Sequence, residues 1–430
     1  MEEQVTLQNN SDSVNRTSLE DKQKLEVEFL RRPNQFIARE SYLKQQFMVE
    51  GINGDTNFAL QKYHTPFSLC DQMIRKLQDY TGFIRGKKIL IYNIEFLDYL
   101  YRYGIMMDNE VWFINENPLK VKFANHIYIG DRDDKFVVNE FLKIDEDMKF
   151  DIIVMNPPYQ GTQEKKGEKR GGGTTLWDKF VVKSLDLLNE DGYLCAVHPA
   201  NWRGTGNYKD LGKLMKSNQI EYLEIHDTTD GQKTFGAGTR YDWYVMKNCH
   251  CNHKTKIKGQ DSQEYDIDIS KLPFIPNGMF HEVLSLIAKE NEEKVEVLHS
   301  YSDYESRKPW MNKEKTENHQ YPCVMQVGTK NEISSLWWSN KNNGMFGIPK
   351  VISGSMASGV MLDTKGEYGL TQHCFAIVDE PKNLEKIKES LLNPYFIKIS
   401  RMASIVSKDK YDRNFIKLLR KDFWKEFVNK

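Results

Sequence analysis

Long apolar runs are missing from this chain of 430 residues. No stretch of about 18 apolar residues occurs, which excludes an ordinary membrane-spanning helix. The first residues, Met1 to Thr6, lack the basic-then-apolar order of a secretory signal. Cysteine is also scarce: six residues are scattered along the chain, which excludes a disulfide-stabilised extracellular scaffold. We therefore expect reduced thiols and a cytoplasmic protein without membrane contact.

The chain has no excess of charge of either sign, because 60 Lys and Arg balance 61 Asp and Glu. A uniformly polycationic protein is excluded, whereas a local basic face for nucleic acid is not. Residues 401–430 form one basic segment, with nine Lys and Arg against four acids, and Lys165, Lys166, Lys169 and Arg170 form another. Each segment is either a contact face for nucleic acid or an ordinary solvated surface.

Three familiar site patterns are also missing. Gly171–Gly173 lacks the Lys-Ser/Thr of a phosphate-binding loop, so we expect a flexible loop there. Cys249, Cys251 and the neighbouring histidines are too closely spaced to surround one tetrahedral zinc ion, which favours a chance cluster. No Asp…Glu-x-Lys nuclease pattern stands out, which favours an enzyme without a fused nuclease.

The most informative segment is residues 150–159, Phe-Asp-Ile-Ile-Val-Met-Asn-Pro-Pro-Tyr. Its apolar, β-branched run has the composition of a buried central strand. Pro157 and Pro158 cannot continue a sheet ladder, because each lacks a backbone N–H. The strand must end there, at the edge of a parallel sheet where ligands usually bind. An Asn amide, rigid carbonyls and a Tyr ring at this edge suit the amino group of a flat base.

Strands and helical segments alternate from about residue 60 to residue 250, which predicts an α/β domain with a mostly parallel sheet. The strands are expected at residues 89–92, 111–114, 136–138, 151–155, 193–197, 222–225 and 241–246, the last one antiparallel. After Lys258 the pattern loosens into a mixed, aromatic-rich region punctuated by prolines. We predict three parts: an N-terminal polar and helical arm (1–59), a catalytic domain (60–258) and a mixed α+β domain (259–430).

The order of the motifs resembles the gamma-arranged methyltransferases of restriction–modification systems, which methylate adenine N6 in DNA with S-adenosylmethionine. A Thr-Pro element (Thr65-Pro66) precedes the first strand, acids follow two later strands, and Asn156-Pro157-Pro158-Tyr159 ends the fourth. The resemblance implies a Rossmann-like catalytic domain followed by a C-terminal target-recognition domain. It covers residues 60–250 by motif, and the remainder only by position and size.

The resemblance also implies the residues that hold the cofactor. Tyr63, Thr65 and Pro66 would lie over its methionine end, and Glu116 would accept hydrogen bonds from the two ribose hydroxyls. Glu140 would bind the adenine amine of the cofactor, where the family more often has Asp. Leu176, Trp177 and Phe180 match an element that lines the cofactor and target pockets. Asn156 is also expected to contact the cofactor.

The catalytic residues follow from the same resemblance. Asn156 and the Pro157 carbonyl would hold the target amine in line with the methyl group, a contribution of positioning and not of acid–base catalysis. Tyr159, after Pro158, would stack on an adenine flipped out of the duplex. Tyr241 is expected to face that base from a late strand, with Trp243 and Phe235 as the alternatives.

The chain departs from the family after the first strand, where a glycine-bearing loop is normal. Here the strand continues into Tyr92-Asn93-Ile94-Glu95-Phe96, with no glycine before Gly104. Side chains at 93–95 would crowd the cofactor unless the chain takes another path. Either the cofactor is held differently, with Glu95 meeting its amino group, or its binding is lost.

We therefore expect a monomeric, site-specific adenine-N6 methyltransferase acting on double-stranded DNA, whose protein partner, if it has one, is a separate cognate restriction endonuclease. Two alternatives remain open. One is a methyltransferase for RNA or for a protein glutamine, because the same motif presents those amines. The other is a nucleic-acid-binding subunit whose cofactor site has decayed at residues 92–97.

Overall fold

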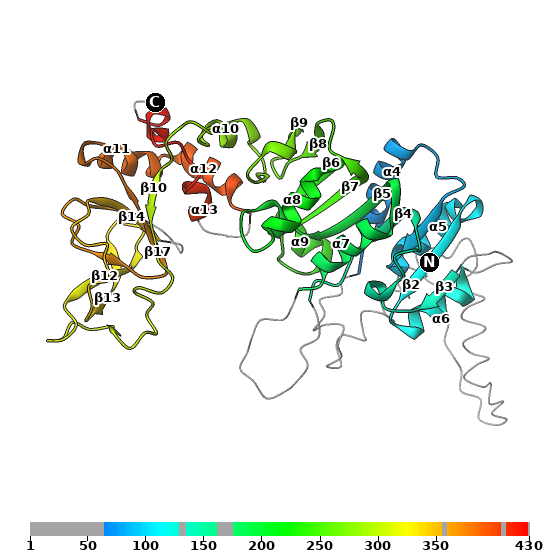
Figure 1. The fold of residues 1–430 in the computed structure, drawn as a ribbon, viewed down its shortest axis with the longest axis horizontal. Helices are drawn as coiled ribbons and strands as arrows, with labels where there is room; N and C mark the ends of the chain where they lie inside the picture. The colour runs from blue at the N-terminus through cyan, green and yellow to red at the C-terminus, as the bar shows by residue number, and fades with distance from the viewer. Residues whose placement is uncertain (1–63, 129–134, 161–174, 355–358, 406–409, 429–430) are drawn as a thin grey trace, which may run out of the picture. The chain divides into compact units, whose positions relative to one another are not determined.

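The computed structural model describes residues 64–128, 135–160, 175–354, 359–405 and 410–428. The chain divides into two compact units, Met1–Ala196 and Val197–Lys430, and the division falls within one strand (Figure 1). The predicted arm at 1–59 lies outside the described residues. The expected domain boundary at residue 258 stays a prediction.

The first unit has the α/β architecture expected from the sequence. Its strands lie in the order β3-β2-β1-β4-β5, and each neighbouring pair is parallel. The elements are α4 (Phe67–Thr81), β1 (Lys88–Ile91), α5 (Ile94–Arg102), η3 (Ile105–Asp108), β2 (Glu110–Asn115), α6 (Pro118–Ile127), β3 (Lys135–Val138), η4 (Phe141–Lys143), β4 (Phe150–Met155), α7 (Trp177–Leu187) and β5 (Leu188–Pro199). This is a Rossmann-like arrangement with the parallel strands in its centre.

The core of this unit explains the apolar run at 152–154. Strand β4 lies inside the sheet, between β1 and β5. Its consecutive residues Ile152, Ile153 and Val154 are at most 1% exposed, so both faces of the strand are covered. A strand covered on both faces has no reason to alternate polar and apolar residues. The strand ends at Met155, as its two following prolines require.

The second unit begins with helices and strands that continue the α/β pattern. Strands β6 and β7 are antiparallel, as expected for the late strand, while β6 pairs parallel with β8 and β8 antiparallel with β9. The elements are η5 (Ala200–Arg203), α8 (Lys209–Ser217), β6 (Asn218–His226), α9 (Thr228–Phe235), β7 (Tyr241–His250), β8 (Thr255–Lys258), β9 (Glu264–Ile267), η6 (Ile269–Lys271) and α10 (Phe280–Ser285).

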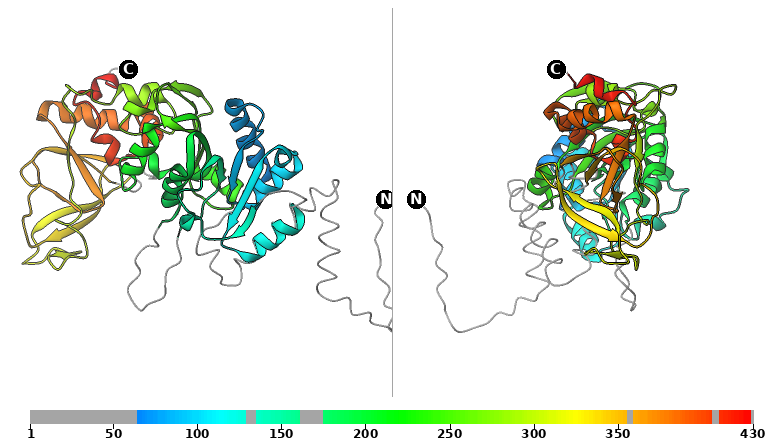
Figure 2. Two further views of the ribbon diagram at one scale, coloured as in Figure 1. Left: turned by 45° about the vertical axis from the view of Figure 1, so that its right-hand side comes forward. Right: turned by 90° about the vertical axis from the view of Figure 1, so that its left-hand side faces the viewer.

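The remainder of the second unit is mixed α+β, as predicted for residues 259–430. It contains two four-stranded sheets in the orders β10-β17-β14-β15 and β11-β13-β12-β16. Figure 2 shows its helices gathered at one end and the β12–β13 hairpin at the other. The elements are β10 (Glu296–Leu298), β11 (Met311–Asn312), β12 (Tyr321–Val327), β13 (Ile333–Ser339), β14 (Lys350–Gly354), β15 (Val360–Asp363), β16 (Gly369–Leu370), β17 (Cys374–Val378), α11 (Pro381–Leu392), α12 (Pro394–Ala403), α13 (Arg413–Ile416) and η7 (Phe423–Glu426).

All six cysteines lie in the described part and are free thiols. Among the described helices, none is long and apolar enough to cross a membrane.

Candidate active site

The Asn-Pro-Pro-Tyr segment lies at the carboxyl end of β4, next to the carboxyl end of β1. Asn156 and Tyr159 are each 3% exposed, and both prolines between them are buried. The parallel pairing of the two strands brings residues 92 and 93 beside residue 156, although 63 positions separate Asn93 from Asn156. The site is therefore built from two chain segments that meet at one edge of the sheet.

The predicted Thr-Pro element contacts this segment directly. Thr65 is fully buried, and its hydroxyl accepts a hydrogen bond of 3.1 Å from the side-chain Nδ2 of Asn156. Pro66 caps the start of α4, so the helix fixes where the Thr65 hydroxyl lies. Because Thr65 binds the nitrogen end of the amide, it determines which way the carbonyl end of Asn156 points. Tyr63, also predicted for this element, lies outside the described residues.

Asn93 forms a two-way hydrogen bond with the backbone of Asn156. Its Nδ2 donates to the Asn156 carbonyl at 2.9 Å, and its Oδ1 accepts from the Asn156 N–H at 2.6 Å. Asn93 precedes α5, which begins at Ile94. The segment after β1 thus turns at once into a helix, and the Asn93 side chain lies along the catalytic motif. This is the other path that the missing glycines required.

Glu95, in the first turn of α5, is buried and faces His64. One carboxylate oxygen lies 2.9 Å from His64 Nδ1, while Oε2 is buried without a hydrogen-bond partner among the described residues. Burial raises the pKa of Glu95, but the hydrogen bond and charge of His64, with Lys120, outweigh it and hold the pKa below its ordinary value. A buried, ionised carboxylate with one unmatched oxygen suits a cationic ligand group.

Glu116 follows β2, and Tyr92 holds its carboxylate in place. The Tyr92 hydroxyl donates to Glu116 Oε2 at 2.9 Å, and burial together with the Glu116 charge raises the pKa of Tyr92. The Tyr92 ring meets Phe141 and Phe180 edge-on, and those two rings stack 4.7 Å apart. Tyr92 therefore joins the ribose-binding acid expected from the sequence to an aromatic wall that includes the predicted Phe180.

The other predicted residues of the first unit differ in their surroundings. Glu140 is on the surface, where it pairs with Lys143 at 2.7 Å. Trp177 is 1% exposed at the start of α7, and Leu176 precedes it as the N-cap. The Gly171–Gly173 loop lies outside the described residues. The role of Glu140 in binding the cofactor stays a prediction.

Tyr241, the predicted second aromatic, lies in the other unit at the start of β7. Its ring stacks on His226 at 4.4 Å and meets Phe235 edge-on, and its hydroxyl donates to Asp230. Its rivals Phe235 and Trp243 are buried as well, at 6% and 1% exposure. Which aromatic faces the target base stays a prediction.

Arg203, which follows β5 in the η5 turn, is held inside the second unit. It is 2% exposed, so it is neither an exposed loop residue nor available to a DNA phosphate. Its guanidinium pairs with Asp242 at 2.7 Å and donates to the Ile275 and Pro276 carbonyls and to Asn277. The residues around Arg203 in the sequence do not indicate these partners, which are 39 to 74 positions away.

Sequence reasoning gave no role to three residues that the structure brings to this edge: His64, Tyr92 and Asn93. The absence of glycine drew attention to residues 92–97, but it suggested that their side chains would crowd the cofactor. The pairing of β1 with β4 would have placed Asn93 beside Asn156, but it does not specify where an Asn side chain turns. His64 was visible only as the neighbour of Thr65.

Comparison with known proteins agrees with this geometry. A model of the Eco57I restriction-modification methylase family matches residues 87–235. The chain resembles restriction–modification adenine methyltransferases. The matched span contains Asn93, Glu95, Glu116 and the Asn-Pro-Pro-Tyr segment. Methylases of this kind use S-adenosylmethionine, which is the cofactor implied here.

Three curated relatives match short parts of the chain. An uncharacterized adenine-specific methylase of Mycoplasma pneumoniae is 36% identical over 83 residues, 18% of each chain. The modification methylase CviBIII of Paramecium bursaria Chlorella virus NC1A is 32% identical over 118 residues, 26% of this chain and 30% of that one. A release factor glutamine methyltransferase of Fusobacterium nucleatum is 32% identical over 127 residues, 26% of this chain and 34% of that one. The chain thus spans at most about a third of each relative's length.

A solved structure, the type IIG restriction endonuclease BpuSI, aligns with 88% of this chain and 62% of its own, with 8% identity and a TM-score of 0.44.

The residues at the sheet edge fit S-adenosylmethionine chemically. The buried, unmatched Oε2 of Glu95 suits the ammonium of a methionine group. Glu116, held by Tyr92 after β2, suits a ribose diol. Two spaced acids at the edge of a parallel sheet therefore match the ammonium and the ribose diol of that cofactor.

Proposed function

We propose that this protein is a site-specific DNA adenine-N6 methyltransferase. The observation that carries the proposal is the double fixation of Asn156: Thr65 binds its side-chain amide and Asn93 binds its backbone. A side-chain amide that is oriented at its nitrogen and anchored through its own backbone is a rigid acceptor for an exocyclic amine. The match to restriction-modification methylases at residues 87–235 supports the same conclusion.

In the proposed reaction, the chain positions the amine and the cofactor supplies the electrophile. Asn156 Oδ1 and the Pro157 carbonyl would accept the two hydrogens of adenine N6 and direct the nitrogen lone pair. S-adenosylmethionine, when bound, supplies a methyl group on a sulfonium sulfur. Correct orientation of two reactants accounts for a large part of a rate enhancement. The surplus proton on N6 after the transfer would pass to water.

The adenine must leave the duplex to reach this edge, which costs a few kcal/mol. Tyr159 would offset part of this cost by stacking on the base, with Tyr241 as the proposed second aromatic. Residues 259–430 would recognise the target sequence in double-stranded DNA. We further propose a monomer that acts in the cytoplasm, with any restriction endonuclease on a separate chain.

RNA and a protein glutamine are the two other acceptors that suit the same chemistry. The glutamine methyltransferase among the relatives favours a protein glutamine as the second candidate. A decayed cofactor site is disfavoured, because Glu95 is buried, ionised and oriented by His64 instead of being displaced.

The test is methyl transfer from labelled S-adenosylmethionine to mixed-sequence DNA and, in parallel, to a protein containing accessible glutamines. We expect label in adenine. Asn156→Ala should lower the transfer rate about 100-fold or more, because the amine loses its orientation. Asn383→Ala, at a partly exposed position of α11 where the amide donates to Asp379, is the matched control and should keep the full rate.

Calorimetry with S-adenosylhomocysteine should still show binding to Asn156→Ala, although Asn156 is itself a proposed cofactor contact, and this separates loss of chemistry from loss of folding. Label in the protein and none in DNA would contradict the proposal. No heat of cofactor binding in the wild type would favour the decayed subunit.

A further inference from the structure

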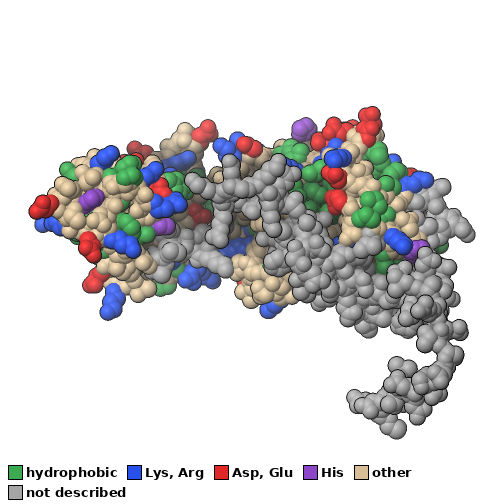
Figure 3. Space-filling model, turned by 90° about the horizontal axis from the view of Figure 1, so that it is seen from below, with side chains coloured by type: hydrophobic (Ala, Val, Ile, Leu, Met, Phe, Trp, Pro, Cys, Tyr) green, Lys and Arg blue, Asp and Glu red, His purple; other side chains and the backbone are tan. Residues whose placement is uncertain are grey.

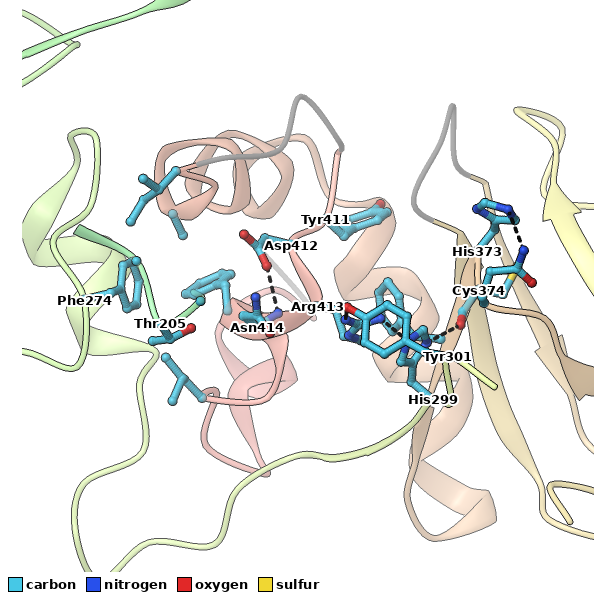
Figure 4. Close-up of a pocket in the computed structure, with 18 residues that line it drawn as sticks. Thr205, Phe274, His299, Tyr301, His373, Cys374, Tyr411, Asp412, Arg413 and Asn414 are labelled. Atoms are coloured by element: carbon cyan, nitrogen blue, oxygen red, sulfur yellow. Dashed lines mark hydrogen bonds between the residues drawn. The ribbon is translucent and has the colours of Figure 1, made fainter. Parts of the chain in front are cut away.

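A cavity in the second unit is lined by segments far apart in the sequence. Its volume is about 310 Å³. Figure 4 shows Thr205 and Phe274 on one wall and Arg413, Tyr301 and His299 on the other, with Asp412 and Asn414 between them. A cavity of this size can hold a phosphate with its attached sugar.

Arg413 supplies the positive charge of the cavity. Its two terminal nitrogens donate to His299 Nε2 and to the Tyr301 hydroxyl, and its guanidinium carbon lies 4.8 Å from the centre of the Tyr301 ring. Both acceptors are neutral, and no carboxylate of the described residues lies within 4.0 Å of this guanidinium. Arg413 Nε is buried without an acceptor. The charge is therefore held and oriented but not neutralised by these residues.

His299 acts as a fixed acceptor for this guanidinium. Its Nδ1 lies 2.9 Å from the Cys374 carbonyl and donates to it, which leaves Nε2 as the acceptor for Arg413. Burial lowers the pKa of His299, and the charges of Arg413 and Lys417 lower it further. The imidazole therefore stays neutral and adds no charge to the cavity.

The surroundings of the cavity add positive charge. Arg401 acts electrostatically on both Lys410 and Tyr411, and Lys417 acts on His299. The one carboxylate in the lining, Asp412, accepts a hydrogen bond from the Asn414 N–H. Elsewhere on this unit, positive and negative side chains are interspersed, as the face in Figure 3 shows. The cations named around the cavity thus outnumber its one carboxylate.

We propose that this cavity binds a phosphate of the DNA strand, with Arg413 as its main contact. A half-buried guanidinium without a counter-anion gains most from a ligand that supplies one, and its planar fork matches phosphate oxygens. Thr205, exposed on the opposite wall, would face the same phosphate. The choice of DNA as the source of the phosphate rests on the proposed function. Such a contact fixes the register of the duplex and carries no base specificity.

The experiment measures DNA affinity against salt concentration without cofactor, so that methyl transfer plays no part. Arg413→Gln should weaken binding and make the slope of log K against log salt shallower by about 0.9, the loss of one phosphate contact. Arg420→Gln, which removes a surface cation paired with Glu426, is the matched control and should leave the slope unchanged.

Thr205→Glu provides a second variant in case Arg413→Gln unfolds. It places a negative charge in the cavity from an exposed loop, and we expect weaker DNA binding with an unchanged melting temperature. Wild-type affinity and slope in both folded variants would overturn the proposal.

Calorimetry with inorganic phosphate and with a mononucleotide separates the two sources of phosphate. Binding of either ligand that is lost in Arg413→Gln, together with an unchanged DNA slope, would assign the cavity to a free small ligand and overturn its role in DNA contact. If the wild type shows no salt-dependent DNA binding, the proposed function fails, and the same calorimetry still decides whether the cavity holds an anion.

Discussion

A single side chain, Asn93, determines how the site tolerates the loss of the usual glycines. Glycine permits close approach of a backbone to a ligand. Here the Asn93 side chain instead bonds to the backbone just after β4, where the prolines have ended the strand. It satisfies the N–H and the C=O of Asn156, two buried backbone groups that would each cost about 1–3 kcal/mol if unpaired. We therefore regard Asn93 as a residue that positions the proposed catalytic Asn156.

Asn93→Ala should lower kcat about 10- to 100-fold, because the Asn156 backbone is released by a fraction of an ångström. The affinity for S-adenosylhomocysteine should stay within about threefold, since Glu95 and Glu116 are untouched. Steady-state kinetics and calorimetry measure the two quantities. Asn125→Ala, which removes a comparable amide bonded to the Val121 carbonyl in α6, is the control. A fall in melting temperature with unchanged kcat would reduce Asn93 to a structural role.

At the scale of elements, helix α9 packs so closely on the segment before β7 that one of its positions has no room for a side chain. A Cβ on Gly231 would lie 2.0 Å from the Thr239 carbonyl oxygen, and that oxygen belongs to the backbone and cannot rotate away. Asp227 starts the helix by accepting a hydrogen bond from the Asp230 N–H. The cap and the close approach together place Tyr241 at the start of β7.

Gly231→Ala should therefore destabilise the protein by about 1–3 kcal/mol, the usual cost of forcing extra atoms into a packed interface. Urea denaturation measures the change. Gly238→Ala is the matched control, because the nearest atom to its Cβ would be a flexible Gln232 oxygen at 3.7 Å. Equal midpoints for the two variants would show that the backbone around Thr239 yields easily.

At the scale of the whole molecule, stability depends on ionisable groups that folding removes from water. His198 is fully buried; its Nε2 lies 3.0 Å from the Tyr244 hydroxyl, and its Nδ1 lies 3.1 Å from the Pro199 carbonyl. Burial lowers the pKa of His198 from 6.5 to about 4, although the contact with Pro199 opposes this. The unfolded chain thus takes up this proton at a higher pH than the folded protein.

The stabilising contribution of His198 is complete above pH 6.5 and is lost as the pH falls through about 4. Over this interval we expect the free energy of unfolding to fall by about 3 kcal/mol from this group alone. Urea denaturation of the wild type and of His198→Gln, at pH 7 and pH 4.5, measures the difference. An equally steep loss in both proteins would assign the pH dependence to other groups.

The succession of strands along the chain and the end of β4 could be predicted because their causes are local. A β-branched apolar run favours a buried strand, and two prolines end it wherever it lies. The contact between Thr65 and Asn156 was foreseeable only as a consequence of the family resemblance, since 91 positions separate them. The surroundings of Arg203 and Tyr241 were not foreseeable, because partners from distant segments bury both side chains.

The sequence by itself determined the α/β pattern, the strand that carries Asn156 and the chemical types of the groups at its end. Only the tertiary structure decided that Asn93 replaces the glycine-bearing turn, that Tyr92 holds Glu116, and that Arg413 lines a cavity with no described carboxylate paired to its guanidinium. The physical reason is range: strand propensity and proline geometry act between neighbouring residues, whereas hydrogen bonds and burial depend on which distant segments the fold brings together.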